Sequence, residues 1–425
     1  MIINSFTSLK MIRIRQLIQY KSFISNTFSL AISRGVDMIT QLLVMPKLIS
    51  LFGIDNYGNI AFYTIILQYL TTFCDFGFNF NATKRVTSLS NVDDLSYIFT
   101  SVQIAKTLIM VVLNILLFFC FVFINNFDYK LYLAISIFVV LSSYNIDWLF
   151  LGKQQMIVPT ILKLIVRFIY VFIIFFYFSP ESNCLYIVML DCCIPIISIF
   201  SIIYAMSQYK IRFIRVSKVY IKEIFIESWV LFSSSLFIGF YRNINVLVLK
   251  LVAGEYYAGV YAAVEKISRA CQSIIEPITT ALFPFVSKKT DGNLHAKRNL
   301  INRLLFIYMI GLIFLIPLFV VFTDFILSFF KIEGEGALLN FYIMLSAFFF
   351  GCMNYLIGYV GLVNLNLNKQ FRSSVFMVGL MAIPLSFVLS YFFKNIGAAI
   401  SVGISEFVLF TFLFCHFKRY VKTIL

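Results

Sequence analysis

Long, nearly unbroken runs of apolar residues recur along this chain, and they restrict its possible folds more than any other feature. Residues 108–124 and 164–178 are two of these runs. Neither alternates between apolar and polar residues, as a strand with one polar face does. About 20 apolar residues suffice to cross a bilayer as a helix, in which the backbone makes all its hydrogen bonds internally. The runs therefore predict an all-α polytopic membrane protein.

The composition supports a lipid environment for the whole chain. Of 425 residues, 61% are hydrophobic and only 12% are charged, whereas about 25% of the residues of a typical soluble domain are charged. The net charge of +15 would suggest nucleic-acid binding in a soluble protein. Membrane proteins, however, concentrate Lys and Arg in their cytoplasmic loops. We therefore predict no soluble domain and no nucleic-acid partner.

The apolar runs divide the chain into about twelve predicted transmembrane helices, separated by short turns that carry Gly, Pro, Asn and Asp. Their limits are 25–51, 57–80, 97–124, 130–151, 156–178, 184–208, 226–251, 256–286, 301–324, 338–363, 372–393 and 396–417. A basic segment follows the sixth helix. We therefore expect a lead-in plus a six-helix lobe over 1–208, a cytoplasmic linker over 209–225 and a second six-helix lobe over 226–425.

The loop charges predict the orientation, because Lys and Arg are retained on the cytoplasmic side. With the N-terminus inside, the cytoplasmic segments hold Lys10, Arg13, Arg15, Lys21, Lys84, Arg85, Lys153, Lys210, Arg212, Arg215, Lys218, Lys222, Lys288, Lys289, Lys297, Arg298, Arg303, Lys369, Arg372, Lys418, Arg419 and Lys422. The opposite side holds only Lys130, Lys250, Lys331 and Lys394. This asymmetry predicts that both termini are cytoplasmic. The apolar and basic segment 1–21 is predicted to be an amphipathic helix at the cytoplasmic face.

Two glycine pairs recur at equivalent places in the predicted lobes. Gly53 and Gly58 follow the first predicted helix, and Gly254 and Gly259 follow the seventh with the same five-residue spacing. Parallel repeats related by an axis along the membrane normal are one known plan of membrane transporters. The repeated pair therefore favours a six-plus-six transporter.

Residue types that hold metals or carry out hydrolysis form no chemical pattern in this sequence. The histidines, His295 and His416, are in or beside basic segments, and no C-x-x-C pair occurs. No P-loop, hydrolytic triad or carboxylate pair stands out. The cysteines are Cys74, Cys120, Cys184, Cys192, Cys193, Cys271, Cys352 and Cys415, and most are inside apolar runs. We predict no disulfide, no metal, no cofactor and no enzymatic activity.

Charged residues inside the predicted helices require an explanation, since a charge near the bilayer centre costs about 2.5–3.5 kcal/mol on insertion scales. The basic ones are Arg34, Lys47, Lys106, Lys163, Arg167, Arg242, Lys266 and Arg269, and the acidic ones are Asp37, Asp75, Asp147, Asp191, Glu265, Glu276 and Glu406. Those near predicted helix ends can extend to water, and they are Lys47, Lys106 and Asp147. The others favour a polar interior.

Some of these charges can neutralise each other on their own helix. Arg34 and Asp37 are three residues apart, and Glu265 and Arg269 are four apart, so each pair shares a helix face. Such self-pairing is an alternative to a role in ligand binding. Both interpretations stay open at this point.

Lys163 and Arg167 have no such neighbour, because their predicted helix contains no acid. They are four residues apart and therefore share one face. At ~1.5 Å per residue, Arg167 is roughly 16 Å along the helix from Met156, which places it near mid-membrane. Cations without acidic partners at that depth predict a water-filled cavity and an anionic ligand. The guanidinium fork of Arg suits phosphate in particular.

Four stretches of the sequence carry a resemblance to a known family. They are 46–58 (PKLISLFGIDNYG), 75–85 (DFGFNFNATKR), 147–153 (DWLFLGK) and 259–267 (GVYAAVEKI), the last followed by Pro277 and by 283–287 (FPFVS). Together they resemble the Wzx-type O-antigen and polysaccharide flippases. These belong, with the MATE-like drug exporters, to the multidrug/oligosaccharidyl-lipid/polysaccharide superfamily. Segment 242–245 reads RNIN, where an Asp is common in that family.

The resemblance implies a MATE-like fold of two six-helix lobes around a cationic cavity. It implies a flippase of the bacterial inner membrane that moves undecaprenyl-diphosphate-linked repeat units from the cytoplasmic to the periplasmic leaflet by alternating access. The implied partners are that lipid-linked oligosaccharide, membrane lipids, a polysaccharide polymerase and a chain-length regulator. The candidate residues for binding the diphosphate are Arg34, Lys163, Arg167, Arg242, Lys266 and Arg269. The candidates for coupling to protons or Na⁺ are Asp37, Asp75 and Glu276.

Three alternatives remain open on the sequence. A MATE-like multidrug exporter would share the fold, although a basic lumen repels the cationic compounds that such exporters often carry. A membrane-embedded polysaccharide polymerase or ligase would be expected to have a large external loop with Arg or His, and the longest external segment here, 325–337, is short. A membrane scaffold without transport would have little need of cations at mid-membrane.

Overall fold

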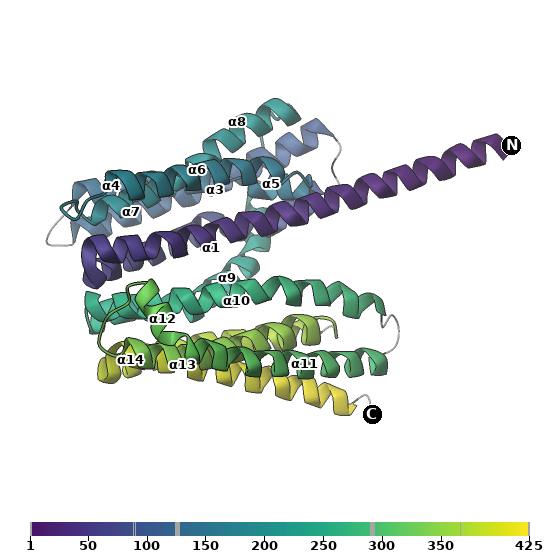
Figure 1. Cartoon of the computed structure of the whole chain (residues 1–425). Coiled ribbons are helices and arrows are strands. Elements are labelled where there is room, and N and C mark those ends of the chain that lie inside the picture. Colours follow the sequence, from purple (N-terminus) through teal and green to yellow (C-terminus); the bar gives the residue numbers. More distant parts are fainter. Residues whose placement is uncertain are drawn as a thin grey trace. The chain divides into compact units, whose positions relative to one another are not determined.

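The computed structural model describes residues 2–423 except 88, 90, 124–127, 290–293 and 366. Within that part, the side chains of 2–25, 27, 230, 241, 274, 277, 280, 281, 283–285, 287–289, 294 and 420–423 are not described, so the motif residue Pro277 and most of 283–287 lie outside the described side chains. Nearly all of the described backbone is helical, and none of it forms a strand (Figure 1). The prediction of an all-α protein is therefore confirmed.

The observed helices follow most of the predicted limits, although the predicted helix 130–151 is interrupted at 144–146. They are α1 (Ile2–Asp75), α2 (Phe78–Val86), α3 (Val92–Val122), α4 (Tyr129–Ser143), α5 (Asp147–Gly152), α6 (Ile157–Tyr177), α7 (Leu185–Cys193), η1 (Ile194–Ile196), α8 (Ile197–Tyr209), α9 (Lys218–Val252), α10 (Glu255–Lys289), α11 (Leu294–Val321), α12 (Thr323–Phe329), α13 (Ala337–Tyr355), η2 (Leu356–Val363) and α14 (Asn368–Thr423). The sixth predicted helix is divided into α7, η1 and α8 around Pro195, because proline has no N–H to donate and clashes with the preceding turn.

Nine of the described helices or helix pairs are long and apolar enough to cross a membrane. Two are much longer than one crossing, and each contains a residue with non-helical backbone angles: Gly53 (φ 78°) in α1 and Lys394 (φ 53°) in α14. Both residues are where a turn between two helices was predicted. Two crossings for each of these helices, together with α10, would reconcile the nine spans with the predicted twelve, and the exact count stays a prediction.

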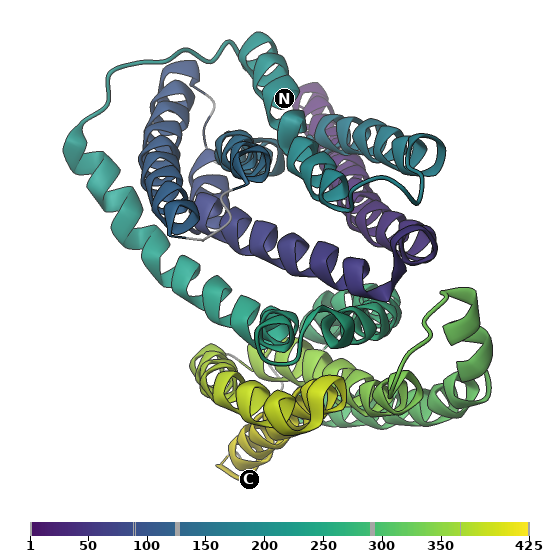
Figure 2. The same ribbon diagram turned by 90° about the vertical axis from the view of Figure 1, so that its left-hand side faces the viewer.

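The chain divides into two compact units. The first unit comprises Met1–Thr40, Leu67–Tyr177 and Leu185–Ser233, and the second comprises Gln41–Ile66, Phe178–Cys184 and Ser234–Leu425. Each unit contains helices that run side by side (Figures 1 and 2). Both α1 and α9 contribute to the two units, because each helix begins in the first and continues into the second. The predicted lobes 1–208 and 226–425 stay a prediction.

The core of the first unit packs α2 and α3 against α5 and the start of α9. Phe78, Phe99 and Trp148 are almost completely buried there. The start of α9 is fixed to α2 by a 2.6 Å ion pair between Arg85 and Glu227. Large aromatic side chains fill this core because they bury much apolar area with few rotatable bonds.

The core of the second unit is formed by α11, α13, η2 and α14. Phe348, Leu356 and Phe417 are nearly inaccessible within it. The element η2 is a π-helical continuation of α13. Such wider turns are uncommon and frequently occur at functional sites.

A close helix crossing within the second unit joins α1 to α10. A side chain at Gly58 would collide with the backbone carbonyl oxygen of Glu255, and one at Gly259 would collide with that of Ile54. The two backbones touch at this point, which only glycine permits. The predicted glycine repeat thus has a structural use: one glycine of each pair forms this contact.

Candidate functional site

The six predicted substrate-binding cations fall into two groups, one in each unit. The first unit holds Arg34, Lys163 and Arg167, and the second unit holds Arg242, Lys266 and Arg269. A diphosphate site that uses all six residues stays a prediction.

In the first unit, Lys163 and Arg167 of α6 share one acid, Asp37 of α1. Nε and Nη2 of Arg167 are 3.0 and 2.9 Å from Oδ1 of Asp37. Nζ of Lys163 pairs with Oδ2 of Asp37 and donates to the hydroxyl of Ser33 at 3.1 Å. The prediction that the two cations have no acidic partner is therefore wrong. Their partner is on another helix, 130 residues before Arg167 in the chain.

This Lys163–Asp37–Arg167 cluster keeps a positive charge, because two cations share one carboxylate. The side chains of Lys163, Arg167 and Asp37 are 26%, 15% and 31% exposed. Exposure of three charges to lipid would be costly, so the open side of the cluster is expected to face a polar lumen. An anionic oxygen that enters from that side would meet donors from both cations.

Arg34 is one turn before Asp37 on α1 and does not pair with it. Its side chain is exposed and makes no ion pair or hydrogen bond with the described residues. Self-neutralisation of Arg34 by Asp37 is therefore wrong, since the carboxylate turns to α6. Arg34 is therefore a third cation in the region of the single carboxylate of Asp37.

The second unit pairs its two arginines more completely. Nη2 of Arg269 is 2.7 Å from Oε1 of Glu265, four residues earlier on α10, so here the self-pairing alternative is correct. The guanidinium of Arg269 also donates to the backbone oxygen of Arg242. Nη2 of Arg242 is 3.8 Å from Oε1 of Glu276, at the outer limit of an ion pair. Neither arginine is left with an excess of positive charge around it.

Lys266 is in a different environment from the two arginines. Its ammonium group lies 5.5 Å from the centre of the Tyr57 ring, a cation–π contact between α10 and α1 within the second unit. It makes no ion pair with the described residues. Of the three predicted cations in this unit, Lys266 is the most available to an anion.

Asp75, a predicted coupling residue, is beside Lys106 in the first unit. Nζ of Lys106 is 3.8 Å from Oδ1 of Asp75 and donates to the backbone oxygen of Asn145 at 2.9 Å. The Lys106 side chain is only 1% exposed. The prediction that Lys106 extends to water is therefore wrong, because the turn before α5 covers it. Each of the three predicted coupling acids, Asp37, Asp75 and Glu276, thus has a cationic neighbour.

The second unit contains a polar cavity that was not predicted from the sequence. It encloses about 250 Å³ among α9, α10, α11, α13 and α14. Its polar lining residues are Arg242, Gln272, Glu276, Tyr308, Asn354, Tyr355 and Glu406. Glu406 was recognised only as an acid inside an apolar helix. Glu406 and Glu276 are far apart in the sequence, so the sequence does not indicate that their carboxylates line one cavity.

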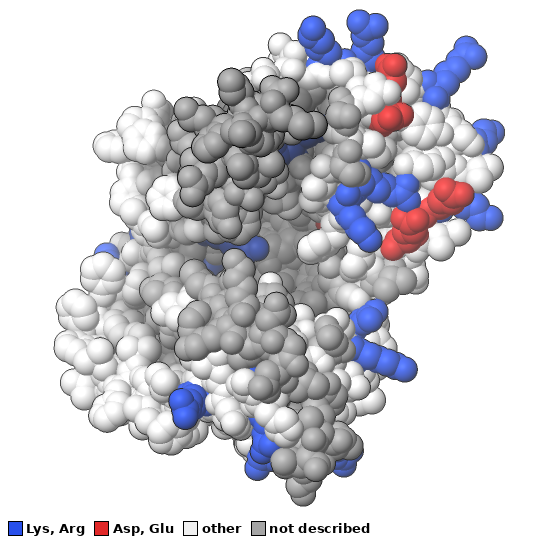
Figure 3. Space-filling model, turned by 90° about the vertical axis from the view of Figure 1, so that its right-hand side faces the viewer, with Lys and Arg blue, Asp and Glu red and all other residues white. Residues whose placement is uncertain are grey.

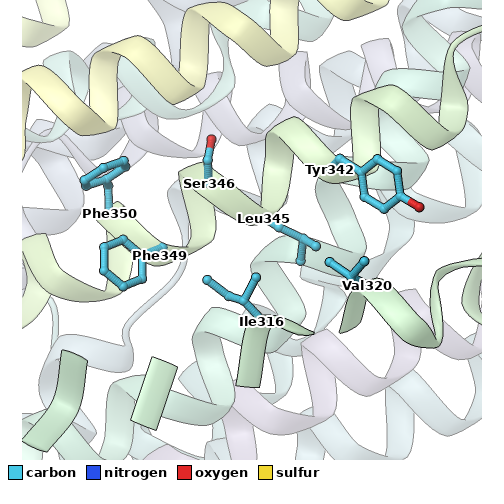
Figure 4. Close-up of a pocket in the computed structure, with 7 residues that line it drawn as sticks. All are labelled: Ile316, Val320, Tyr342, Leu345, Ser346, Phe349 and Phe350. Atoms are coloured by element: carbon cyan, nitrogen blue, oxygen red, sulfur yellow. The ribbon is translucent and has the colours of Figure 1, made fainter. Parts of the chain in front are cut away.

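A second hollow in the same unit is almost wholly apolar (Figure 4). It lies on α11 and α13 and is lined by Ile316, Val320, Tyr342, Leu345, Ser346, Phe349 and Phe350. The hydroxyl of Ser346 points away from Ile316 and Val320 and donates to the backbone oxygen of Ile343 at 2.6 Å (Figure 4). This hollow therefore presents no charge to a diphosphate.

The surface charge agrees with the excess of Lys and Arg in the sequence. On the face shown in Figure 3, basic side chains are more frequent than acidic ones. Among the residues that the structure describes, no group of three or more His, Cys, Asp or Glu side chains is placed to hold a metal ion. The candidate sites are thus sites of charge and hydrogen bonding.

Comparison with known proteins identifies relatives of the whole chain. The family described as "Polysaccharide biosynthesis protein" matches residues 23–290. A protein from Escherichia coli (strain K12) named as an O-antigen transporter is 24% identical over 403 residues, which cover 93% of this chain and 96% of that protein. More than half of the present chain therefore matches the family.

Solved structures show the same fold. The lipid II flippase MurJ, in an inward closed conformation, superposes with a TM-score of 0.68 and 16% identity, covering 93% of this chain and 87% of that one. The MATE multidrug transporter DinF-BH gives a TM-score of 0.57 and 15% identity, with coverage of 94% and 95%. At these identities the likeness establishes the architecture alone, which is that of the superfamily indicated by the sequence motifs.

Proposed function

The chain belongs to the polysaccharide biosynthesis protein family of membrane transporters, and we propose that it is a flippase for undecaprenyl-diphosphate-linked O-antigen or polysaccharide repeat units. In this proposal it moves them from the cytoplasmic to the periplasmic leaflet by alternating access. The diphosphate binds cations inside the protein, the glycan occupies the polar lumen, and the polyprenyl chain stays in the lipid. The cluster of the first unit supplies the principal anion site.

The observation that carries this proposal is the excess of positive charge around Asp37. Lys163 and Arg167 share that one carboxylate and are partly exposed. A transporter of cationic drugs gains nothing from such a cluster, whereas a diphosphate would find a bidentate guanidinium and an ammonium group in one place. The arrangement therefore supports an anionic substrate.

Transport of the lipid-linked unit in one direction requires a source of energy beyond substrate binding. Moving one charge across the membrane involves about 2.3 kcal/mol per 100 mV, so an anionic headgroup is affected by the potential. We propose that coupling to protons or Na⁺ at Asp37, Asp75 or Glu276, or consumption of the glycan outside, drives the cycle. A change in the charge of Asp37 would alter the anion site directly, because Asp37 contacts both cations.

The proposed location is the bacterial inner membrane, with both termini in the cytoplasm. The proposed partners are the lipid-linked oligosaccharide, a polysaccharide polymerase and a chain-length regulator. We further propose that the chain is not an enzyme. In this scheme a separate polymerase joins the repeat units after they reach the periplasmic leaflet.

A deletion and complementation experiment tests the function. In a strain that lacks the native copy, we expect no repeat unit at the cell surface and an accumulation of lipid-linked units, both reversed by this chain. A polymerase deletion would instead leave single repeat units on the surface, and a ligase deletion would leave polymer on the lipid carrier. Either of these phenotypes would contradict the proposal.

Drug susceptibility of the same strains separates the flippase from a multidrug exporter. We expect the deletion strain and the complemented strain to have equal sensitivity to cationic dyes and antibiotics. A sensitivity that rises on deletion, with surface polysaccharide unchanged, would favour the exporter.

A further inference from the structure

The cavity of the second unit has the opposite charge balance to the cluster of the first unit. Glu276 and Glu406 contribute two carboxylates to its lining, and Arg242 contributes one cation. A lining with a net negative charge repels phosphate. The cavity is therefore unsuited to the diphosphate, although Arg242 was predicted to bind it.

The hydrogen bonds in the cavity leave acceptors available. Nδ2 of Asn354 donates to Oε2 of Glu406 at 2.7 Å and to the backbone oxygen of Glu406 at 2.8 Å. Asn354 is only 5% exposed, and its Oδ1 atom has no hydrogen-bond partner among the described residues. A buried amide oxygen without a donor is unusual, and Asn354 is also one of the residues that line the cavity. Asn354 is therefore a candidate ligand-binding residue.

The backbone beside Asn354 is shaped to keep the cavity open. Gly351 lines it, and a β-carbon at that position would collide with Nε2 of Gln272, another lining residue. Immediately after Asn354 and Tyr355, α13 widens into the π-helical η2. Wider turns of this kind are frequent at functional sites.

The size of the cavity limits what it can hold. At about 30 Å³ per water, 250 Å³ corresponds to about eight waters. A bare Na⁺ ion would occupy only a small part of this space. Pockets for larger organic ligands measure about 300–1,000 Å³, so a whole repeat unit does not fit. One small ring fits best.

We propose that this cavity binds a single neutral or amino sugar of the lipid-linked glycan and disfavours acidic sugars. The inference rests on the proposed flippase function and names the glycan class that it accepts. Tyr308, Tyr355 and Phe371 offer rings to the apolar C–H face of a pyranose. Carboxylates accept hydrogen bonds from hydroxyls or an ammonium group, and the amides of Gln272 and Asn354 complete the polar edge. A uronic acid would bring a third carboxylate beside Glu276 and Glu406.

Export of two matched glycans tests the proposal. The deletion strain complemented by this chain would be supplied with one of two repeat units on the same diphosphate lipid, one with a neutral or amino sugar and one with a hexuronic acid in its place. We expect the neutral or amino form to be exported about tenfold better, from one added like-charge contact in a partly shielded site. In Glu276→Gln/Glu406→Gln the ratio should fall severalfold. The control, Glu333→Gln, removes an exposed carboxylate outside the cavity and should leave the ratio unchanged.

The outcomes separate this inference from the function itself. No export of either glycan by the wild type would contradict the flippase. Equal export of the two glycans by the wild type would overturn only the cavity's role. The same holds if the export ratio is unchanged in the double variant at a normal level of protein in the membrane.

Direct binding to the purified protein provides a second measurement that does not depend on transport. Saturation-transfer NMR should detect glucosamine but not glucuronate, and the glucosamine signal should be lost in Asn354→Ala. Gly351→Val, which places a side chain where Nε2 of Gln272 now lies, should lose it as well. Stabilisation by NaCl that depends on Glu276 and Glu406, without a sugar signal, would assign the cavity to a cation and overturn the proposal.

Discussion

The charged sites of the two units have opposite balances of cations and carboxylates. The first unit sets two cations, Lys163 and Arg167, against the single carboxylate of Asp37. The cavity of the second unit contains two carboxylates, those of Glu276 and Glu406, and one cation, that of Arg242. The first arrangement retains a charge that attracts phosphate, and the second retains a charge that repels it. This difference is the basis of our proposal that the headgroup and the glycan are recognised in different places.

The largest effect is expected when the positive excess is removed. In Lys163→Gln/Arg167→Gln, surface polysaccharide per unit of membrane-inserted protein should fall at least about tenfold, since hydrogen bonds to charged groups contribute about 1.5–3 kcal/mol each. Arg167→Lys should retain partial export, because an ammonium group still attracts phosphate without the bidentate fork. Normal export from the double variant would remove this pair from the site.

A smaller effect is expected when the positive excess is increased. Asp37→Asn leaves Lys163 and Arg167 without their shared carboxylate, so the diphosphate should bind more tightly and leave more slowly. We expect export to fall a few-fold while more lipid-linked saccharide copurifies with the protein. Asp37→Glu, which keeps the charge, is the control. Equal copurification from Asn and Glu variants would show that Asp37 does not compete with the substrate.

The smallest effect is expected from an arginine of the other unit. The side chain of Arg242 is 45% exposed and 3.8 Å from Glu276, and exposed ion pairs of this kind contribute about 0–1 kcal/mol. Arg242→Gln should therefore change export by less than about fivefold, whereas Arg167→Gln should reduce it strongly. Arg242→Gln and Arg167→Gln are the same change in the two units, so the same assay compares them directly. Equal losses from the two variants would show that the units do not differ as described.

The fold could be predicted because apolar runs, turn residues and loop charges are local signals. The turn at 53–56 was predicted, and Gly53 has the positive φ of a chain reversal. The interruption at Pro195 was not, although proline gave a signal for it. Local patterns therefore located the helices, and the break within a continuous apolar run was the harder feature to find.

The candidate site was predicted less completely, because spacing along one helix does not reveal a partner on another. Spacing correctly paired Glu265 with Arg269, where partner and neighbour coincide. It failed for Asp37, which has a cation on its own helix but pairs with α6. The prediction that Lys106 extends to water was wrong for the same reason, because its partner, the backbone oxygen of Asn145, is outside its own helix. Glu406 carried a signal, an acid in an apolar helix, but its companions in the cavity come from distant parts of the chain.

The backbone contact at Gly58 and Gly259 restricts how this protein can change during evolution. In most helix pairs, a larger residue on one side can be accommodated by a smaller one opposite. Here both residues are already the smallest available, and the opposing atoms belong to the backbone, so no second substitution can restore the fit. No compensating substitution is therefore available at this crossing. During evolution, either both glycines are kept or the contact is lost.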